Sequence, residues 1–328
     1  MSDLLSFDEN GVQFAWDATS VSNYAKCPRY YKWVNLEGWQ PLETSVHLLF
    51  GGWYAKALEE FYVLRAEGKT HDEALNEIVY RTLIRTWNYE YAPDDNIDRD
   101  RDHWKAQVID GIEPIEDNGP WESLHNTKTR ETLIRSIVWY FEEFGEDDNT
   151  KVMIVNGEPA VELSFSLPLY DDILYCGHID RGVIFGDDKF AMDQKTSGAT
   201  ISKRFFEGFS PDYQMSGYVF AGSIMWDTHI SGVIIDAAQI AVGFTAFTRG
   251  FVHKPPQVIA EWREDVIALI KRAREDTAND HFIPNFTACD KYGGCQFRKI
   301  CARAPEHRER ALSVDFTRKA RWDPLKQR

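Results

Sequence analysis

The chain has 328 residues, with 37 Lys and Arg against 52 Asp and Glu, so its net charge is −15. With 43% hydrophobic and 27% charged residues, the composition is that of a folded globular protein and excludes an intrinsically disordered chain. No apolar run reaches the ~18 residues that span a bilayer, and the first residues lack a basic and then apolar leader, so we expect no membrane association and a cytoplasmic location.

The first 145 residues are predicted to be mostly helical. Four segments carry helical periodicity or capping signals: a helix that starts at Thr19-Ser20, and segments 48–68, 71–91 and 128–144. Residues 1–18 are expected to form only a short lead-in.

The pattern changes near residue 151. Segments 161–167, 173–185 and 189–196 have the composition of strands, and the last two are joined by Gly186-Asp187-Asp188. After them we expect a helix, a strand pair and a long helix, at 212–226, 231–251 and 255–276. This order predicts a mixed α/β domain with a helical N-terminal elaboration.

The cysteines are unevenly distributed. Three of the five lie in one short loop, as Cys289, Cys295 and Cys301, and Cys27 near the N-terminus is a candidate fourth ligand. Such grouping indicates a metal or cluster site. The spacing is wider than the short steps of zinc fingers and favours a [4Fe–4S] cluster over zinc, while Cys176 is predicted to be a buried core thiol.

Carboxylates and a lysine gather on the two strands of the predicted hairpin. Asp193 and Lys195 are two residues apart and share a face of their strand. If the hairpin loop has two residues, paired positions have an odd index sum, and Asp180 lies opposite Asp193 or Lys195 on the same face.

This arrangement suits metal-assisted phosphodiester hydrolysis. Asp180 and Asp193 are candidate ligands of Mg²⁺ or Mn²⁺, with the carbonyl of Gln194 as a further ligand. Lys195 is suited to stabilise charge on a phosphate. A surface hairpin with an ordinary Asp–Lys pair is the alternative, since D-x-K alone is a weak pattern.

The chain resembles the RecB-like branch of the PD-(D/E)XK nuclease superfamily, which includes the nuclease domains of RecB and AddB and the CRISPR-associated RecB-like nucleases with an iron–sulfur cluster. The resemblance rests on stretches in the family's order: SVSNYAKCPRYYKW, FGGWYAKALEEFY, VELSF, GHIDRGV, MDQKTSG, DYQMSGYVFAG and CDKYGGCQFRKIC.

The resemblance implies a restriction-endonuclease-like core with a mixed central sheet flanked by helices. It implies Asp180 and Asp193 as metal ligands, Lys195 as the catalytic lysine, and Gln214 and Tyr218 as substrate-positioning residues, although Tyr218 equally suits helix packing. It also implies a one-plus-three set of cluster ligands: Cys27, Cys289, Cys295 and Cys301.

Two positions depart from the family pattern. The slot that usually holds a histidine ligand is Ala55, and Glu59 is the preferred substitute, ahead of Glu60 or His47. The step from Cys289 to Cys295 is also wider than usual. Glu162 also falls on a family position. It is either a further acid near the metal or the partner of a neighbouring cation on the sheet.

We therefore expect a single nuclease domain over 1–328, with a helical part at 19–148, a catalytic α/β core at 151–250 and a cluster-bearing part at 285–305 with the Cys27 region. The expected activity is Mg- or Mn-dependent cleavage of DNA ends or single strands, in recombination, repair or phage DNA processing. Expected partners are DNA and a helicase or recombination protein. The chain has no G-x4-GK[ST] motif of its own, which favours a free enzyme or a small subunit. The alternatives are a non-catalytic DNA-binding protein on the same fold and a zinc-bound interaction module.

Overall fold

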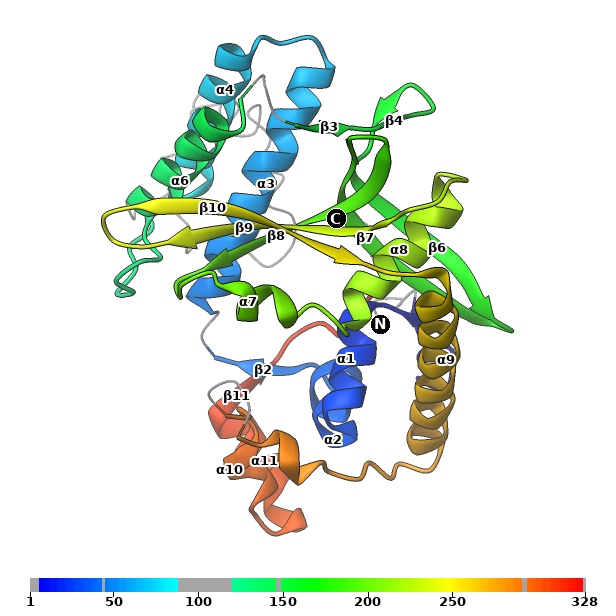
Figure 1. Cartoon of the computed structure of the whole chain (residues 1–328). Helices are drawn as coiled ribbons and strands as arrows, with labels where there is room; N and C mark the ends of the chain where they lie inside the picture. Colours follow the sequence, from blue (N-terminus) through cyan, green and yellow to red (C-terminus); the bar gives the residue numbers. More distant parts are fainter. Residues whose placement is uncertain (1–5, 43–44, 88–119, 146–148, 291–293, 327–328) are drawn as a thin grey trace, which may run out of the picture.

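The computed structural model describes residues 6–42, 45–87, 120–145, 149–290 and 294–326. A mixed sheet lies at its centre, with helices on both faces (Figure 1). The main path of the sheet runs in the order β1-β7-β8-β9-β10, and β3 and β6 also pair with β7. The strands are β1 (Ala15–Trp16), β3 (Thr150–Val152), β6 (Val161–Tyr170), β7 (Ile173–Phe185), β8 (Asp188–Ser197), β9 (Gly232–Ile240) and β10 (Thr245–His253).

The hairpin of β7 and β8 has the two-residue loop on which the sequence argument depended. Phe185 pairs with Asp188 and Arg181 with Met192, so the paired indices sum to 373 throughout. Beyond the hairpin, β8 runs parallel to β9 as far as Ser197. The predicted strand pair is also present, because β9 and β10 form a regular antiparallel ladder.

The sheet forks along one edge of β7. Its pairing with β8 ends at Arg181, and its pairing with the short parallel strand β1 involves Leu174 and Tyr175. Within the described residues, the stretch of β7 between these two contacts has no strand partner on that edge. Asp180 lies at the fork, where β7 and β8 separate.

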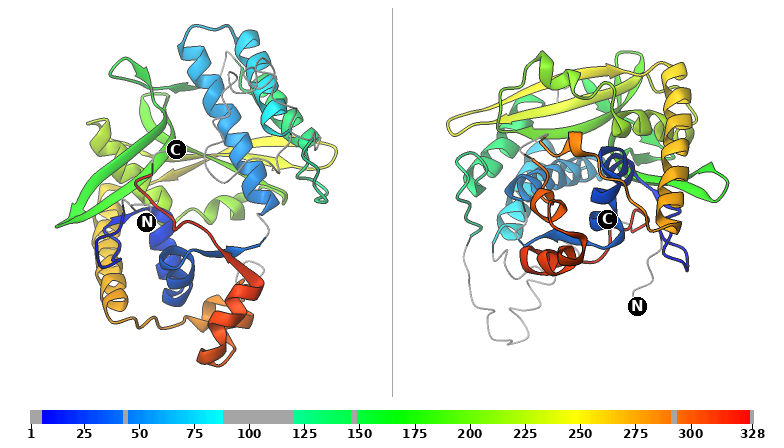
Figure 2. Two further views of the ribbon diagram at one scale, coloured as in Figure 1. Left: turned by 180° about the vertical axis from the view of Figure 1, so that it is seen from behind. Right: turned by 90° about the horizontal axis from the view of Figure 1, so that it is seen from below.

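Two helical layers cover the sheet. One face packs against α1 (Ala18–Lys26), α8 (Tyr213–Met225) and α9 (Pro256–Ala278), in a core that includes Ala191 and Ile235 from the strands. The other face, at the end of β9, packs against α3 (Val46–Ala66), α4 (His71–Arg85) and α6 (Arg130–Glu143). The two layers are seen from front and back in Figures 1 and 2.

The helix starts follow local capping chemistry. Thr70 and Thr129 form capping boxes at the starts of α4 and α6, and Asp212 caps α8 through the N–H groups of Gln214 and Met215. The expected start of α1 was late, because the cap is Asp17, whose carboxylate accepts from the N–H of Ser20. Residues 1–18 were expected to form only a short lead-in, but β1 within this segment pairs with β7 of the central sheet.

A small module below the sheet joins the two ends of the chain (Figure 2). Strand β2 (Trp39–Pro41) pairs with β11 (Phe316–Arg318), and Trp33, Trp39, Phe297 and Phe316 share one buried cluster. The other parts of the module are α2 (Pro28–Tyr31), the π-helix η1 (Lys32–Leu36), the 3-10 helix η3 (Phe286–Ala288), α10 (Arg298–Cys301) and α11 (Pro305–Asp315). The remaining elements are β4 (Ile154–Val155), β5 (Glu158–Pro159) and α7 (Lys203–Glu207). Among the helices described, none is long and apolar enough to cross a membrane.

Candidate active site and cysteine pocket

The fork between β7 and β8 brings the two aspartates and the lysine together. Lys195 Nζ lies 2.5 Å from Asp193 Oδ2. Asp180 Oδ2 accepts a hydrogen bond of 2.9 Å from the backbone N–H of Gln194. The side chain of Asp180 therefore takes the place of a ladder bond at the point where the two strands part.

An irregularity in β7 helps to set this geometry. Ile179 packs in the core beneath α8, and Gly182 lies under Trp226 at the end of the same helix. In a regular strand these two positions would face opposite sides. Glu162 on β6 has a φ of 46°. It lies between the pairs Val161–Arg181 and Leu163–Ile179, across from Asp180. The side chains of β7 therefore change their facing between Ile179 and Gly182, where Asp180 lies.

Burial tunes the charge of this site. Asp193 is only 1% exposed, and burial raises its pKa to about 6, with a further contribution from the nearby Asp180 carboxylate. Lys195 opposes that shift. Burial alone lowers the pKa of Lys195, but the carboxylates of Asp193 and Asp180 outweigh it and leave the pKa raised, so the lysine is a cation at neutral pH.

Helix α8 adds two polar groups to the lysine side of the site. Gln214 Oε1 lies 3.4 Å from Lys195 Nζ, and Gln214 Nε2 donates to the hydroxyl of Tyr218 at 2.8 Å. The i, i+4 spacing places both on one face of the helix, as the sequence predicted. Tyr218 is 6% exposed within the main core, so it also packs the helix against the sheet.

The opposite face of β8 carries a buried charge network that the sequence analysis missed. Arg181 donates to Asp236 Oδ2 at 2.8 Å, and Arg249 Nε lies 3.3 Å from Asp236 Oδ1. With its amide oxygen facing Arg181, Gln194 accepts from Nε at 3.1 Å and from Nη2 at 2.9 Å. Asp236 interrupts the apolar run GVIIDAAQI, and a charge in a fully buried strand was the available signal.

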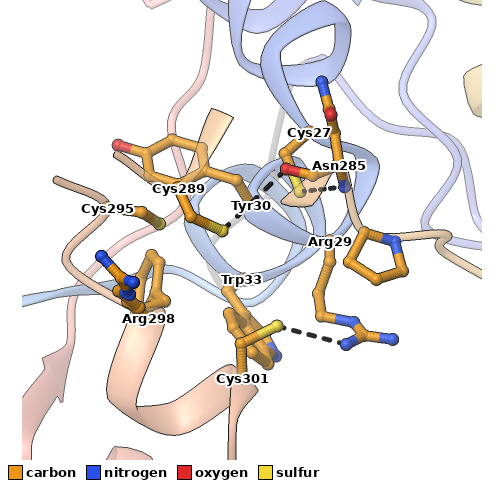
Figure 3. A pocket seen from close by; sticks show the side chains of 11 residues that line it. Cys27, Arg29, Tyr30, Trp33, Asn285, Cys289, Cys295, Arg298 and Cys301 are labelled. Atoms are coloured by element: carbon orange, nitrogen blue, oxygen red, sulfur yellow. Dashed lines mark hydrogen bonds between the residues drawn. The ribbon is translucent and has the colours of Figure 1, made fainter. Parts of the chain in front are cut away.

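Four cysteines line one pocket in the terminal module (Figure 3). Cys27 stands at the junction of α1 and α2, and the pocket encloses about 290 Å³ of empty space, part of it open to solvent. The three other cysteines come from the C-terminal segment: Cys289, Cys295 and Cys301. Cys176 is buried elsewhere, at 1% exposure, where burial raises its pKa to about 11.

Nitrogen donors approach the sulfurs of the pocket. The backbone N–H of Asn285 donates to Cys27 Sγ at 3.3 Å, and Arg29 Nη1 donates to Cys301 Sγ at 3.2 Å. Burial raises the pKa of Cys295, which Lys26 partly offsets. Donors and cations around a set of thiols stabilise their thiolate forms, which are the forms that bind metals.

A family model described as the PD-(D/E)XK nuclease superfamily matches residues 15–302, which include both the forked hairpin and the four cysteines. The chain belongs to the PD-(D/E)XK nuclease superfamily.

Two solved structures resemble this superfamily member at low sequence identity. One, from Eubacterium rectale and described as a candidate exonuclease, has 13% identity and a TM-score of 0.45, with 83% of this chain and 84% of that one covered. The other, the protein SSO0001, has 13% identity and a TM-score of 0.24, with 43% of this chain and 66% of that one covered. A comparison with curated proteins gives no match.

The structure brings some predicted residues of the nuclease together and leaves others apart. Among the residues described, no three His, Cys, Asp or Glu side chains meet closely enough to hold one metal ion. Glu59 contacts Lys56 on its own helix at 2.9 Å and does not complete a three-carboxylate group with Asp180 and Asp193. Glu60 pairs with Arg85 at 2.5 Å.

Helix α3 runs along the face of β8 that carries Thr196 and past the neighbouring Arg181 of β7. Gly51 lies against Thr196 of β8, and Tyr62 stacks over the guanidinium of Arg181 at 4.4 Å. Glu59 falls between these two contacts along the helix. The carboxylates of Asp180 and Asp193 are oxygen donors, which are the ligand type that Mg²⁺ and Mn²⁺ prefer.

Proposed function

We propose that this protein is a metal-dependent DNA nuclease that hydrolyses phosphodiester bonds at the fork between β7 and β8. The observation that carries the proposal is the contact of Lys195 with Asp193 beside Asp180, in a chain of the PD-(D/E)XK superfamily. A buried acid with a raised pKa, in contact with a lysine and beside a second carboxylate, is typical of a functional site.

Each residue has a defined task in this proposal. Asp180 and Asp193 hold one or two Mg²⁺ or Mn²⁺ ions, assisted by the carbonyl of Gln194 and by Glu59. A bound divalent ion supplies charge neutralisation at the phosphate and lowers the pKa of a water. Lys195 leaves Asp193 to stabilise negative charge on the phosphate, and Gln214 orients the lysine.

We further propose a RecB/AddB-like subtype, with exonuclease action on DNA ends or single strands and a role in recombination, repair or phage DNA processing beside a helicase or recombination protein. The motif order in the sequence supports the subtype. Tyr218 and Gln214 would position the strand next to the scissile bond.

A [4Fe–4S] cluster in the cysteine pocket is part of the same proposal. A tetrahedral zinc ion with Zn–S bonds of about 2.3 Å holds its sulfurs about 3.8 Å apart. The four cysteines surround a pocket rather than meet at one point, which supports a larger group (Figure 3). Arg29 and the N–H of Asn285 already donate to sulfur, as hydrogen bonds to cluster ligands do.

The test is cleavage of end-labelled DNA with Mg²⁺ or Mn²⁺, and with EDTA as the control. We expect products only with the metal, and none from a Lys195→Ala variant that melts like the parent protein. Cleavage by pure Lys195→Ala protein would refute the assigned role of the lysine.

A second function, DNA binding without cleavage, is favoured by one observation. Ala55 occupies the slot that usually holds a histidine ligand, so the metal site has fewer donors. Retention of labelled DNA without product under either metal would establish this alternative in place of the nuclease.

A further inference from the structure

A buried lysine with unfilled hydrogen-bonding capacity lies beside the end of the catalytic strand. Lys128 is 1% exposed, and its Nζ has no hydrogen-bond partner among the described residues. The ring of Phe50 lies 4.2 Å from this nitrogen and offers a cation–π contact, but no acceptor. Burial lowers the pKa of Lys128 to about 8, so most of the population is charged at neutral pH. A buried ammonium without an acceptor is costly, and it indicates a site for an anion.

Two histidines complete the surroundings of Lys128. The rings of His47 and His125 lie edge to face, with their centroids 4.8 Å apart. The pKa of His47 is lowered, mainly by burial and further by the nearby His125 and Lys128. His125 Nδ1 accepts from the backbone N–H groups of Thr127 and Lys128, at 3.2 and 3.1 Å. These bonds fix the neutral tautomer of His125 that carries its proton on Nε2, so the outer edge of the ring is a donor.

The start of α3 contributes to the same location. His47 is the second residue of this 21-residue helix, and Ser45 makes no side-chain hydrogen bond to its first turn. The first turn carries no acidic residue. The unpaired N–H groups and the helix dipole at such an end favour a negative charge.

This group of donors adjoins the far end of β8. A Cβ added to Gly198 would lie 3.4 Å from Thr127 Oγ1, and one added to Gly51 would lie 3.7 Å from Thr196 Oγ1. Gly198 is three residues beyond Lys195, a strand length of about 10 Å, which is within reach of a phosphate close to the scissile one on the same strand.

We propose that Lys128, His125 and His47 form a phosphate-binding site, which holds a backbone phosphate of the nucleic-acid strand a few nucleotides from the bond that is cut. That the bound phosphate belongs to a nucleic-acid strand rests on the proposed nuclease function. That the site binds an anion does not depend on it. The site gives the strand a second fixed point, so that the scissile phosphate is held at the fork in one register. A free phosphate has the same chemistry, and the experiment separates the two sources.

The main test is binding in EDTA, where no cleavage occurs. The affinity for a fluorescent single-stranded oligonucleotide is measured over a range of salt concentrations for the parent protein, Lys128→Met and the control Lys69→Met. Lys69 is exposed beyond the opposite end of α3. We expect Lys128→Met to weaken binding about 10-fold and to reduce the slope of log K against log salt by about 0.7, the loss of one phosphate contact. Lys69→Met should leave both values unchanged, and an unchanged slope in Lys128→Met overturns the proposal.

Folding is checked by thermal unfolding without phosphate. Methionine has a similar length and needs no acceptor, so Lys128→Met should melt at or above the parent temperature. If it melts lower, His125→Asn replaces it, because Asn Oδ1 can still accept from the two N–H groups while the Nε2 donor is lost. A several-fold loss of oligonucleotide affinity in His125→Asn then supports the site, and an unchanged affinity overturns it.

A final measurement distinguishes a free phosphate from a nucleic-acid phosphate as the bound anion. Inorganic phosphate, compared with chloride at equal ionic strength, should raise the melting temperature of the parent protein and not that of Lys128→Met. If phosphate has this effect but oligonucleotide affinity is independent of Lys128, the site takes free phosphate and the strand proposal is overturned. If the binding results hold while no metal supports cleavage, the nuclease proposal fails and the phosphate site stands.

Discussion

The forked hairpin and the cysteine pocket are assembled in opposite ways. Asp193 and Lys195 lie on one strand, and Asp180 lies on the next, beyond a two-residue loop. The pocket instead joins Cys27 to a segment that begins 258 positions later, at Asn285. The first site depends on the strand ladder, and the second depends on the packing of the chain ends in one small module.

This difference teaches where each site is vulnerable. Loss of a side chain at the hairpin removes chemistry and leaves the backbone in place, because β8 pairs with β7 as far as Met192 and with β9 as far as Ser197. The pocket is held by the short pairing of β2 with β11 and by one aromatic cluster. A change there acts on structure first and on activity second.

The largest expected effect is at the hairpin. Asp193→Asn should reduce cleavage by about 10³-fold or more, because loss of a metal-binding carboxylate removes several kcal/mol of transition-state stabilisation. The measurement is initial rate on end-labelled DNA with Mg²⁺ or Mn²⁺. Asp187→Asn, in the exposed loop of the same hairpin, is the matched control and should retain the parent rate.

The next effect is at the pocket. Cys27→Ser should remove the visible absorbance of an iron–sulfur cluster from anaerobically purified protein and lower the melting temperature by several degrees, because the group that links the two ends is lost. Hydrogen exchange should rise first in β2 and β11. Cys176→Ser, at a buried thiol outside the pocket, should keep the absorbance. A colourless parent protein that contains zinc would favour the zinc module instead.

A smaller effect is the dependence of stability on pH. Burial raises the pKa of Asp193 to about 6 from its usual 3.8, so the folded state binds the proton more tightly than the unfolded state does. Stability in EDTA should therefore fall as pH rises from about 4 to about 6. Unfolding titrations at several pH values should show this fall in the parent and not in Asp193→Asn. Equal pH profiles for the two proteins would contradict the assignment.

The smallest expected effect separates two neighbouring acids. Glu59→Gln should reduce the cleavage rate several-fold and leave the melting temperature nearly unchanged, since Glu59 is proposed to assist the metal. Glu60→Gln should instead lower the melting temperature and leave the cleavage rate nearly unchanged, because it breaks the largely buried ion pair with Arg85. Rates and melting curves of both variants form the test, and equal rates would remove Glu59 from the proposed ligands.

Much of the fold could be predicted from the sequence, and the errors have local causes. The long helices and the hairpin strands have clear periodicity and caps, and they lie close to where they were expected. Strand β1 was missed because its two residues are too few to carry a pattern, and its partner is far along the chain. The start of α1 was misplaced because Asp17, Thr19 and Ser20 are all good capping residues.

The sequence alone determined the types and short spacings of the chemical groups: Asp193 and Lys195 on one strand face, and Gln214 with Tyr218 on one helix face. These follow from the fixed periods of strands and helices. Only the tertiary structure decided that the hairpin loop has two residues and that β7 and β8 part at Asp180. It also decided that Arg181 and Asp236 are buried behind the site, and that Lys128 has no acceptor among the described residues. Burial and long-range contacts depend on how distant segments pack together, and no local pattern carries that information.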